Sequence, residues 1–205
     1  MAARLIGRVL DRAFYARDAR TLAPLLLNKV LTHHDPDAGR LSARIVEVEA
    51  YAGAEDPGSH GYRGPTKRNA TMFGPPGHLY VYFTYGMHWC ANVVGGAEGE
   101  ANGVLLRAAA PMTGIDTMRA RRPAARSDAE LCSGPARLAQ ALGLGRAHDG
   151  IDLVRGVVRL LDDGTPPPDD PTVTARIGLR AGRGDEHPWR FFVPGDPNVS
   201  RGPKV

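Results

Sequence analysis

Long hydrophobic runs are missing from this 205-residue sequence, although 42% of its residues are hydrophobic. No apolar stretch approaches the roughly 20 residues that a membrane-spanning helix needs. Residues 1–7 also lack the apolar segment of a secretory signal peptide. We therefore expect a globular protein of the cytoplasm.

Cysteine and lysine are both scarce. Cys90 and Cys132 lie far apart, and neither is part of a Cys-x-x-Cys or Cys/His spacing, so neither a zinc site nor a disulfide scaffold is indicated. Only Lys29, Lys67 and Lys204 could supply the amine of a Schiff base. The sequence also has no glycine-rich phosphate-binding loop and no nucleophilic serine elbow. We expect neither a metal ion nor an organic cofactor.

The excess of basic residues is small. A formal net charge of +4 favours a polyanionic partner only mildly. The length suits one substantial hydrophobic core and is short for two domains, so residues 1–205 are expected to form a single domain.

The most informative stretch runs from Arg44 to Tyr51. Its alternation predicts a strand with Val46, Val48 and Ala50 on a core face. The opposite face would carry Ile45, Glu47, Glu49 and Tyr51. Two carboxylates beside an aromatic ring suggest a binding or catalytic face, and the competing interpretation is a solvated edge strand.

Two later segments add polar and aromatic groups. Residues 52–78 have no periodicity and predict a long loop, which contains His60. Residues 78–93 predict a β-hairpin with Tyr85 and Gly86 near its tip. A bulky ring at a turn has no obvious core to enter. The strand predicted for residues 102–109 carries Arg107, which must be paired or functional because a buried, unpaired guanidinium is costly.

The remaining elements are expected to be short. The pattern predicts a helix from a cap at Asp18 or Thr21 to about Leu27, where Pro24 fits only if Thr21 is the cap. Further predicted elements are strand 29–34, helix 113–121, a helix capped by Ser133 that ends at Gly143, a strand or strand pair over 152–161, a short helix over 171–177 and strand 189–193.

Taken together, these residues suit hydrolysis at a sugar carbon. A carboxylate can activate water and stabilise an oxocarbenium-like centre while aromatic rings hold a flat group. Residue chemistry alone leaves a glycoside hydrolase with Glu47 and Glu49 as its carboxylate pair open, and also a non-catalytic nucleic-acid-binding module.

Several runs resemble the alkyladenine (3-methyladenine) DNA glycosylase family, the mammalian-type methylpurine glycosylases. The runs that carry the resemblance are Ile45 to Tyr51, Met72-Phe73, Leu79 to Tyr82, Tyr85 to Met87, Val104 to Ala108 and Leu131 to Pro135. The match extends from about Thr21 to Val199. The loop from Gly61 to Thr71 matches less well, so Arg63, Lys67 and Arg68 are kept only as candidate phosphate contacts.

The resemblance implies a role for each matching residue. Glu49 is similar to the family's general base and Arg107 to the residue that helps to hold the attacking water. The base-binding residues implied are Tyr51, His60, Tyr82, Asn92 and Val199. Tyr85 resembles the side chain that intercalates into DNA, with Met87 beside it.

The resulting prediction is an α+β fold: a single domain with a curved, mainly antiparallel sheet, peripheral helices and a protruding β-hairpin. Its function would be that of a monofunctional DNA glycosylase for alkylated or deaminated purines, of the 3-methyladenine, 7-methylguanine, hypoxanthine and ethenoadenine class. Its partner would be double-stranded DNA rather than a membrane, and it would act as a monomer, near the nucleoid if the source is bacterial.

Overall fold

The computed structural model describes residues 7–200, where antiparallel strands predominate. The strands are β1 (Arg8–Val9), β2 (Val30–Asp35), β3 (Gly39–Ala52), β4 (His78–Thr84), β5 (His88–Gly95), β6 (Asn102–Thr113), β7 (Ile151–Asp152), β8 (Val158–Asp162), β9 (Thr172–Thr174) and β10 (Arg190–Phe192). The helices are α1 (Arg12–Tyr15), α2 (Ala19–Leu26), α3 (Ile115–Arg121) and α4 (Pro135–Leu142). Short 3-10 turns are η1 (Gly53–Glu55), η2 (Ala70–Phe73), η3 (Asp128–Glu130) and η4 (Arg146–His148).

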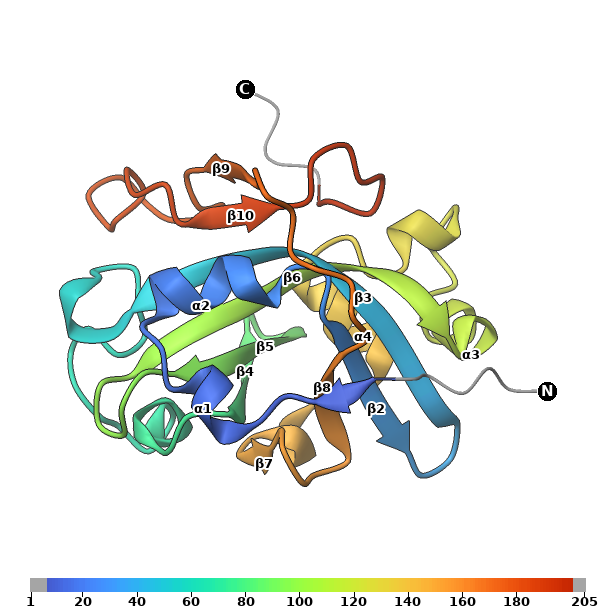
Figure 1. Cartoon of the computed structure of the whole chain (residues 1–205), viewed down its shortest axis with the longest axis horizontal. Coiled ribbons are helices and arrows are strands. Elements are labelled where there is room, and N and C mark those ends of the chain that lie inside the picture. The colour runs from blue at the N-terminus through green and yellow to red at the C-terminus, as the bar shows by residue number, and fades with distance from the viewer. Residues whose placement is uncertain (1–6, 201–205) are drawn as a thin grey trace.

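One curved sheet organises the chain (Figure 1). Its strand order is β1-β8-β2-β3-β6-β5-β4-β7, with β10 paired to β3 and β9 paired to β10. The long pairings β2 with β3, β3 with β6, and β4 with β5 are all antiparallel. The helices lie around the sheet rather than between its strands, so the predicted α+β fold with a curved, mainly antiparallel sheet is confirmed.

β3 lies at the centre of the sheet. Along one edge its first half pairs with β2 and its second half with β10, and along the other edge it pairs with β6. Glu47 and Glu49 on this strand are fully buried. The interpretation as a solvated edge strand is therefore wrong.

A register irregularity interrupts β3 where the sequence predicted simple alternation. Ile45 is opposite Ala109 and Glu47 is opposite Ala108, which leaves Val46 as an extra residue. Ile45 consequently packs in the main core cluster with Val48 and Ala50, and Val46 is buried outside it. The predicted faces of Ile45 and Val46 are thus wrong, because a β-bulge shifts the side-chain alternation by one residue.

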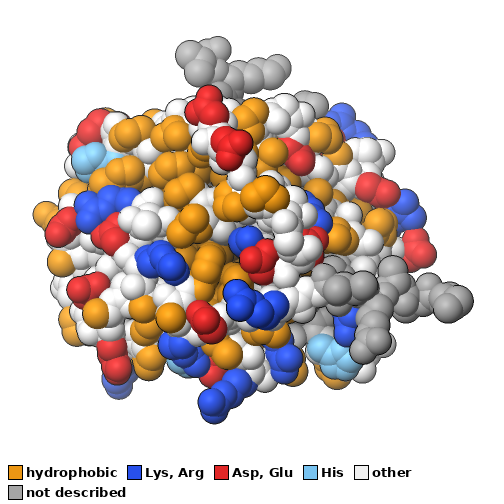
Figure 2. Space-filling model, viewed as in Figure 1, with side chains coloured by type: hydrophobic (Ala, Val, Ile, Leu, Met, Phe, Trp, Pro, Cys, Tyr) orange, Lys and Arg blue, Asp and Glu red, His pale blue; other side chains and the backbone are white. Residues whose placement is uncertain are grey.

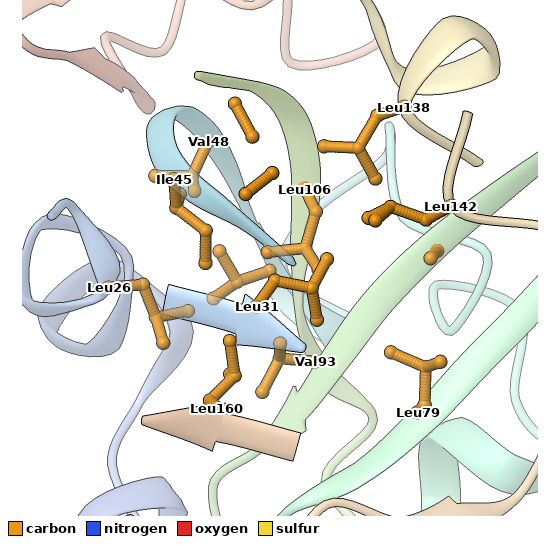
Figure 3. Packing of buried hydrophobic residues seen from close by; sticks show 14 of the residues in the cluster. Leu26, Leu31, Ile45, Val48, Leu79, Val93, Leu106, Leu138, Leu142 and Leu160 are labelled. Carbon is orange, nitrogen blue, oxygen red and sulfur yellow. The ribbon is translucent and has the colours of Figure 1, made fainter. Parts of the chain in front are cut away.

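The core lies on one face of the sheet and is closed by α2 and α4. Figure 3 shows leucine, isoleucine and valine side chains from these helices converging with those of the central strands. The labelled residues are Leu26, Leu31, Ile45, Val48, Leu79, Val93, Leu106, Leu138, Leu142 and Leu160. This cluster supports the opposite face of β3, which carries the two glutamates.

Helix α2 begins earlier than its proline suggested. Asp18 caps it, with the side chain accepting from the Arg20 backbone at 2.8 Å, and Pro24 lies inside the helix rather than in its first turn. The expectation that Pro24 requires the Thr21 cap is wrong. Because Leu22 and Leu26 are fully buried against the sheet, tertiary packing stabilises the helix despite the missing N–H of proline.

Two further local predictions differ from the structure. Gly134, not Ser133, is the N-cap of α4, and the Ser133 hydroxyl instead accepts a hydrogen bond from Arg137. Residues 171–177 do not form a helix, because Thr172–Thr174 is strand β9 and pairs with β10. The hydrogen bonds offered by β10 determine the conformation of this segment more strongly than its local propensity. Residues 151–162 form the predicted pair of strands, β7 and β8.

Charges of both signs are interspersed on the surface shown in Figure 2. Exposed ion pairs such as Arg20–Asp18, Arg119–Asp128 and Arg126–Glu130 neutralise many arginines locally. Within residues 7–200, no helix is both long and apolar enough to cross a membrane.

Candidate active site

Three different parts of the chain contact the Glu49 carboxylate, two through hydrogen bonds and one through an ion pair. The backbone N–H of Ile177 donates to Oε1 at 2.7 Å, and Arg107 Nη1 lies 3.2 Å from the same oxygen. The hydroxyl of Tyr51 donates to Oε2 at 2.9 Å. These donors stabilise the carboxylate in a site from which bulk water is excluded.

Glu47 is engaged even more completely. Its Oε1 accepts from Arg190 Nε at 2.6 Å, from Arg107 Nε at 3.1 Å and from the Ser200 hydroxyl at 2.9 Å. Its Oε2 accepts from the Ser200 backbone N–H at 2.7 Å. Glu47 therefore joins β3, β6, β10 and the C-terminal segment, and this geometry does not fit the second catalytic carboxylate of a glycoside hydrolase.

Arg107 connects the two glutamates. It is the residue of β6 left without a partner on β3 by the register shift between Glu47 and Val48. Its side chain is nearly buried and lies between the two carboxylates. The guanidinium is therefore paired on both sides, which accounts for a charged residue in an otherwise apolar strand.

A cavity of about 370 Å³ is lined by the partners of Glu49, although the fully buried Glu49 side chain does not itself line it. Arg107, Tyr51 and Ile177, the three residues that bind Glu49, all line it. Aromatic and apolar side chains form the rest of the wall, chiefly His60, Met72, Tyr80, Tyr82, Tyr85, Asn92, Leu105 and Leu179. The structure thus places Arg107, Tyr51, His60, Tyr82, Tyr85 and Asn92 around one cavity, and Glu49 behind three of its lining residues.

Three rings form one wall of this cavity. Tyr80 and Tyr82 are stacked with centroids 5.4 Å apart, and the His60 ring meets Tyr82 edge-on at 4.5 Å. His60 Nδ1 lies 3.1 Å from the Tyr80 hydroxyl. A flat, electron-poor group would find electron-rich faces here.

The titratable groups of this wall are held in their neutral forms. Burial raises the pKa of Tyr80 to about 12. Burial and the negative charge of Glu49 raise the pKa of Tyr51 well above its usual value. Partial burial and the positive charge of Arg68 lower the pKa of His60. The wall therefore offers neutral hydrogen-bond donors and acceptors at physiological pH.

The predicted hairpin is confirmed as β4 and β5, with its tip next to the cavity. Its turn is closed by a hydrogen bond from Met87 N to Thr84 O at 3.2 Å. Tyr85 is 84% exposed and Met87 68% exposed. Tyr85 also has a φ of +50°, which is rare for a bulky residue. Tyr85 therefore presents a bulky ring to solvent at the edge of the cavity.

Asn92 and Val199 occupy different places relative to the cavity. Asn92 is nearly buried on β5 opposite Tyr80, and its Nδ2 lies 3.5 Å from the Tyr80 carbonyl oxygen. Val199 does not line this cavity. It borders a neighbouring hollow of about 410 Å³, which Arg107 and Ser133 also line.

Two contributors to the site were not singled out from the sequence. Tyr80 could have been found, because it lies two residues from Tyr82 and a strand places both on one face. Ile177 had no such signal, since it contributes a backbone N–H and lies 128 positions from Glu49.

Metal ligands were not found within residues 7–200: no group of three or more His, Cys, Asp or Glu side chains could hold an ion there. Cys90 and Cys132 are both buried and not bonded to each other. Burial raises the pKa of both thiols, so neither favours the reactive thiolate.

Comparison with known proteins yields a consistent set of relatives. A protein of Burkholderia lata is 56% identical over 201 residues, covering 97% of this chain and 94% of its own length. One of Streptomyces avermitilis is 53% identical, covering 93% and 90%. One of Carboxydothermus hydrogenoformans is 47% identical, covering 94% and 99%. Each carries the name "Putative 3-methyladenine DNA glycosylase".

The family comparison covers nearly the whole chain. Residues 13–197 match the family described as methylpurine-DNA glycosylase, a range that contains Glu49, Arg107 and the hairpin tip. The chain therefore belongs to the methylpurine-DNA glycosylase family and is a DNA glycosylase, a hydrolase that acts in the repair of alkylated DNA.

Proposed function

We propose that this enzyme hydrolyses the N-glycosidic bond of alkylated or deaminated purines in double-stranded DNA and leaves an abasic site. The substrates proposed are 3-methyladenine, 7-methylguanine, hypoxanthine and ethenoadenine. The carrying observation is a fully buried carboxylate, Glu49, directly behind an aromatic cavity that opens beside the exposed Tyr85. A base inside a duplex is unreachable, so a site of this shape requires the nucleotide to be flipped out.

Each step of the reaction has a candidate residue. Tyr85 would enter the stack with Met87 beside it and fill the gap left by the flipped purine. The purine would lie against Tyr51, His60 and Tyr82, where a positively charged alkylated base also gains cation–π attraction. Asn92 would crowd the exocyclic amine of normal guanine.

Glu49 would then act as the general base. A carboxylate has about four acceptor positions. Ile177 donates to Oε1 and Tyr51 to Oε2, and the Arg107 guanidinium forms an ion pair with Oε1. The remaining position, on Oε2, could hold the water that attacks C1′. Arg107 borders both the cavity and the hollow that contains Val199, which suits a residue that holds this water and the neighbouring sugar-phosphate.

The proposed substrates differ in whether the departing base must be protonated before it leaves. Alkylated purines such as 3-methyladenine carry a positive charge and leave easily. Hypoxanthine is neutral and would require protonation, for which the cavity offers no dedicated acid. We expect positively charged lesions to be released faster than neutral ones.

Base release from duplex oligonucleotides tests the proposal. The protein, with EDTA present, should release free base from at least one of the lesions 3-methyladenine, hypoxanthine and ethenoadenine. Glu49→Gln should slow release by about 10²–10⁴-fold while retaining affinity for abasic DNA, because it removes the general base and preserves the shape. A wild-type protein that binds abasic DNA but releases no base from any lesion would be a non-catalytic damage-binding module.

A further inference from the structure

Arg176 is a fully buried arginine that does not line the cavity. Its guanidinium forms a two-pronged ion pair with Asp56, with Nη1 2.5 Å from Oδ2 and Nη2 2.7 Å from Oδ1. Both side chains are completely inaccessible to solvent. Nη1 also donates to the Ala50 carbonyl at 2.9 Å, and Nη2 to the Gly184 carbonyl at 2.9 Å.

The guanidinium also lies against the rings of Tyr51 and Trp189. Its central carbon is 4.5 Å from the Tyr51 ring centroid and 5.0 Å from that of Trp189. The remaining nitrogen, Nε, is buried without a hydrogen-bond partner among the described residues. Burying an ion pair costs desolvation free energy, and the unpaired Nε adds to that cost. A contribution to stability therefore does not by itself explain why an arginine is buried here.

The position of the next residue, Ile177, suggests a role for this buried ion pair in the active site. Ile177 donates its backbone N–H to Glu49, and Ile177, Gly178 and Leu179 line the cavity. Residues 175–180 belong to no helix or strand, so regular backbone pairing does not fix the position of this N–H. The side chain of Arg176, held on β3 and by Asp56, is the nearest anchor of the segment.

We infer that Arg176, locked by Asp56, is a positioning residue for the reaction: it holds the Ile177 N–H against Glu49 and the Tyr51 ring against the purine. Asp56 fixes the anchor to the loop that follows β3, since it also accepts from the Ala52 and Gly58 backbones. The Arg176–Asp56 ion pair thereby fixes the position of the Ile177 N–H, which stabilises the charge of Glu49. It also fixes the Tyr51 ring, which forms one wall of the proposed purine site. The inference rests on the proposed function.

The test compares Arg176→Met and Arg176→Lys with Arg44→Met. Arg44 serves as the control because it is an arginine of β3 whose ion pair, with Asp163, is partly buried and does not line the cavity. Base release is followed at saturating enzyme from pH 5 to 9, together with binding to abasic DNA and thermal unfolding.

Arg176→Met should lower the release rate of folded enzyme by about 100-fold, since small displacements of catalytic groups have effects of that size. The acidic limb of its pH–rate profile should move to higher pH, because Glu49 loses a donor that stabilises its charge. Arg176→Lys keeps the positive charge but cannot form the two-pronged contact with Asp56. Its release rate should therefore lie between those of Arg176→Met and the wild type. Arg44→Met should keep the wild-type profile even if it unfolds at lower temperature.

An unshifted profile in both Arg176 variants, with rate losses no larger than in Arg44→Met, would overturn the inference. If Arg176→Met does not fold, Arg176→Lys and Asp56→Asn decide the question by the same shift of the acidic limb. Absence of base release by the wild type would instead reject the proposed function, so the two failures are distinguishable.

Discussion

Glu47 and Glu49 share Arg107 but have otherwise separate partners. Glu47 is bound by Arg190 and Ser200, which connect it to β10 and the C-terminal segment. Glu49 is bound by groups that line the cavity. Strand parity places both residues on one face and cannot distinguish them; their hydrogen-bond partners do.

Glu47→Gln should therefore affect stability more than chemistry. It leaves the buried cations of Arg107 and Arg190 partly uncompensated, which should lower the free energy of unfolding by about 3 kcal/mol. Urea denaturation measures this loss, and base release per folded molecule should stay well above that of Glu49→Gln. Equal loss of release in both variants, with unchanged unfolding of Glu47→Gln, would make Glu47 a catalytic residue.

The β4–β5 hairpin places the Tyr85 ring, with its positive φ, next to the cavity, where the proposed function assigns it the role of a wedge. Tyr85→Ala should lose more base-release activity on lesions in stable base pairs than on mismatched lesions, because the wedge offsets unstacking and unpairing. Release rates on matched and mismatched duplexes measure the difference. Tyr85→Gly, which removes the ring and relieves the positive φ, should behave like Tyr85→Ala, whereas equal loss on both duplexes would argue against a wedge.

The contact between β2 and η4 contains a pair of histidines. His148 Nε2 lies 3.2 Å from His33 Nε2, His33 Nδ1 lies 2.8 Å from the Leu142 carbonyl oxygen, and the Gly145 N–H donates to His148 Nδ1. This arrangement requires both rings to be neutral, because each nitrogen already has a matched donor or acceptor. Burial and the nearby His33 lower the pKa of His148 below its ordinary 6.5.

Stability should consequently fall as the pH drops below about 6.5. As the pH falls, the unfolded chain takes up a proton on His148 before the folded protein does. The free energy of unfolding should therefore decrease by at most about 1.4 kcal/mol per pH unit from this residue. Urea midpoints between pH 7.5 and 5 measure the slope, to which His60 also contributes. His148→Gln should flatten it and His34→Gln, an exposed control, should not; an unchanged slope in His148→Gln would contradict the prediction.

At the scale of the whole molecule, DNA affinity depends on where basic side chains remain available. A hollow of about 500 Å³ on the hairpin side is lined by Lys67, Arg68 and Arg146 together with Phe83 and Trp89. Lys67 and Arg68, two of the candidate phosphate contacts, thus lie against the β4–β5 hairpin that carries the proposed wedge, and Arg146 lines the same hollow. Arg63 lines a different hollow, with His60 and Tyr62.

Lys67→Ala and Arg146→Ala should each reduce the slope of log K against log salt by about 0.9, the change expected when a protein binds one phosphate fewer. Binding of abasic duplex at several salt concentrations measures this slope. Arg119→Ala is the control, because its charge is already paired with Asp116 and Asp128. An unchanged slope in both test variants would show that this hollow does not contact phosphate.

The sequence by itself determined the features written in neighbouring residues. The strand from Arg44 to Tyr51 and the aromatic hairpin around Tyr85 follow from local spacing and residue type. The runs that resemble the glycosylase family are also local stretches of sequence, and the family match is confirmed. The predictions failed where tertiary contacts override local pattern, as at the Val46 bulge and at β9.

The resemblance assigned the general base to Glu49, but only the tertiary structure decided what holds each glutamate: Tyr51 and Ile177, which line the cavity, bind Glu49. Ile177 and Ser200, which distinguish Glu49 from Glu47, lie 128 and 153 positions from their partners. Both donate a backbone N–H, a group that every residue except proline carries. The residue type at these positions therefore could not predict the backbone contacts. Two carboxylates on one strand, separated by a single residue, have different hydrogen-bond partners because the folded chain brings different donors to each.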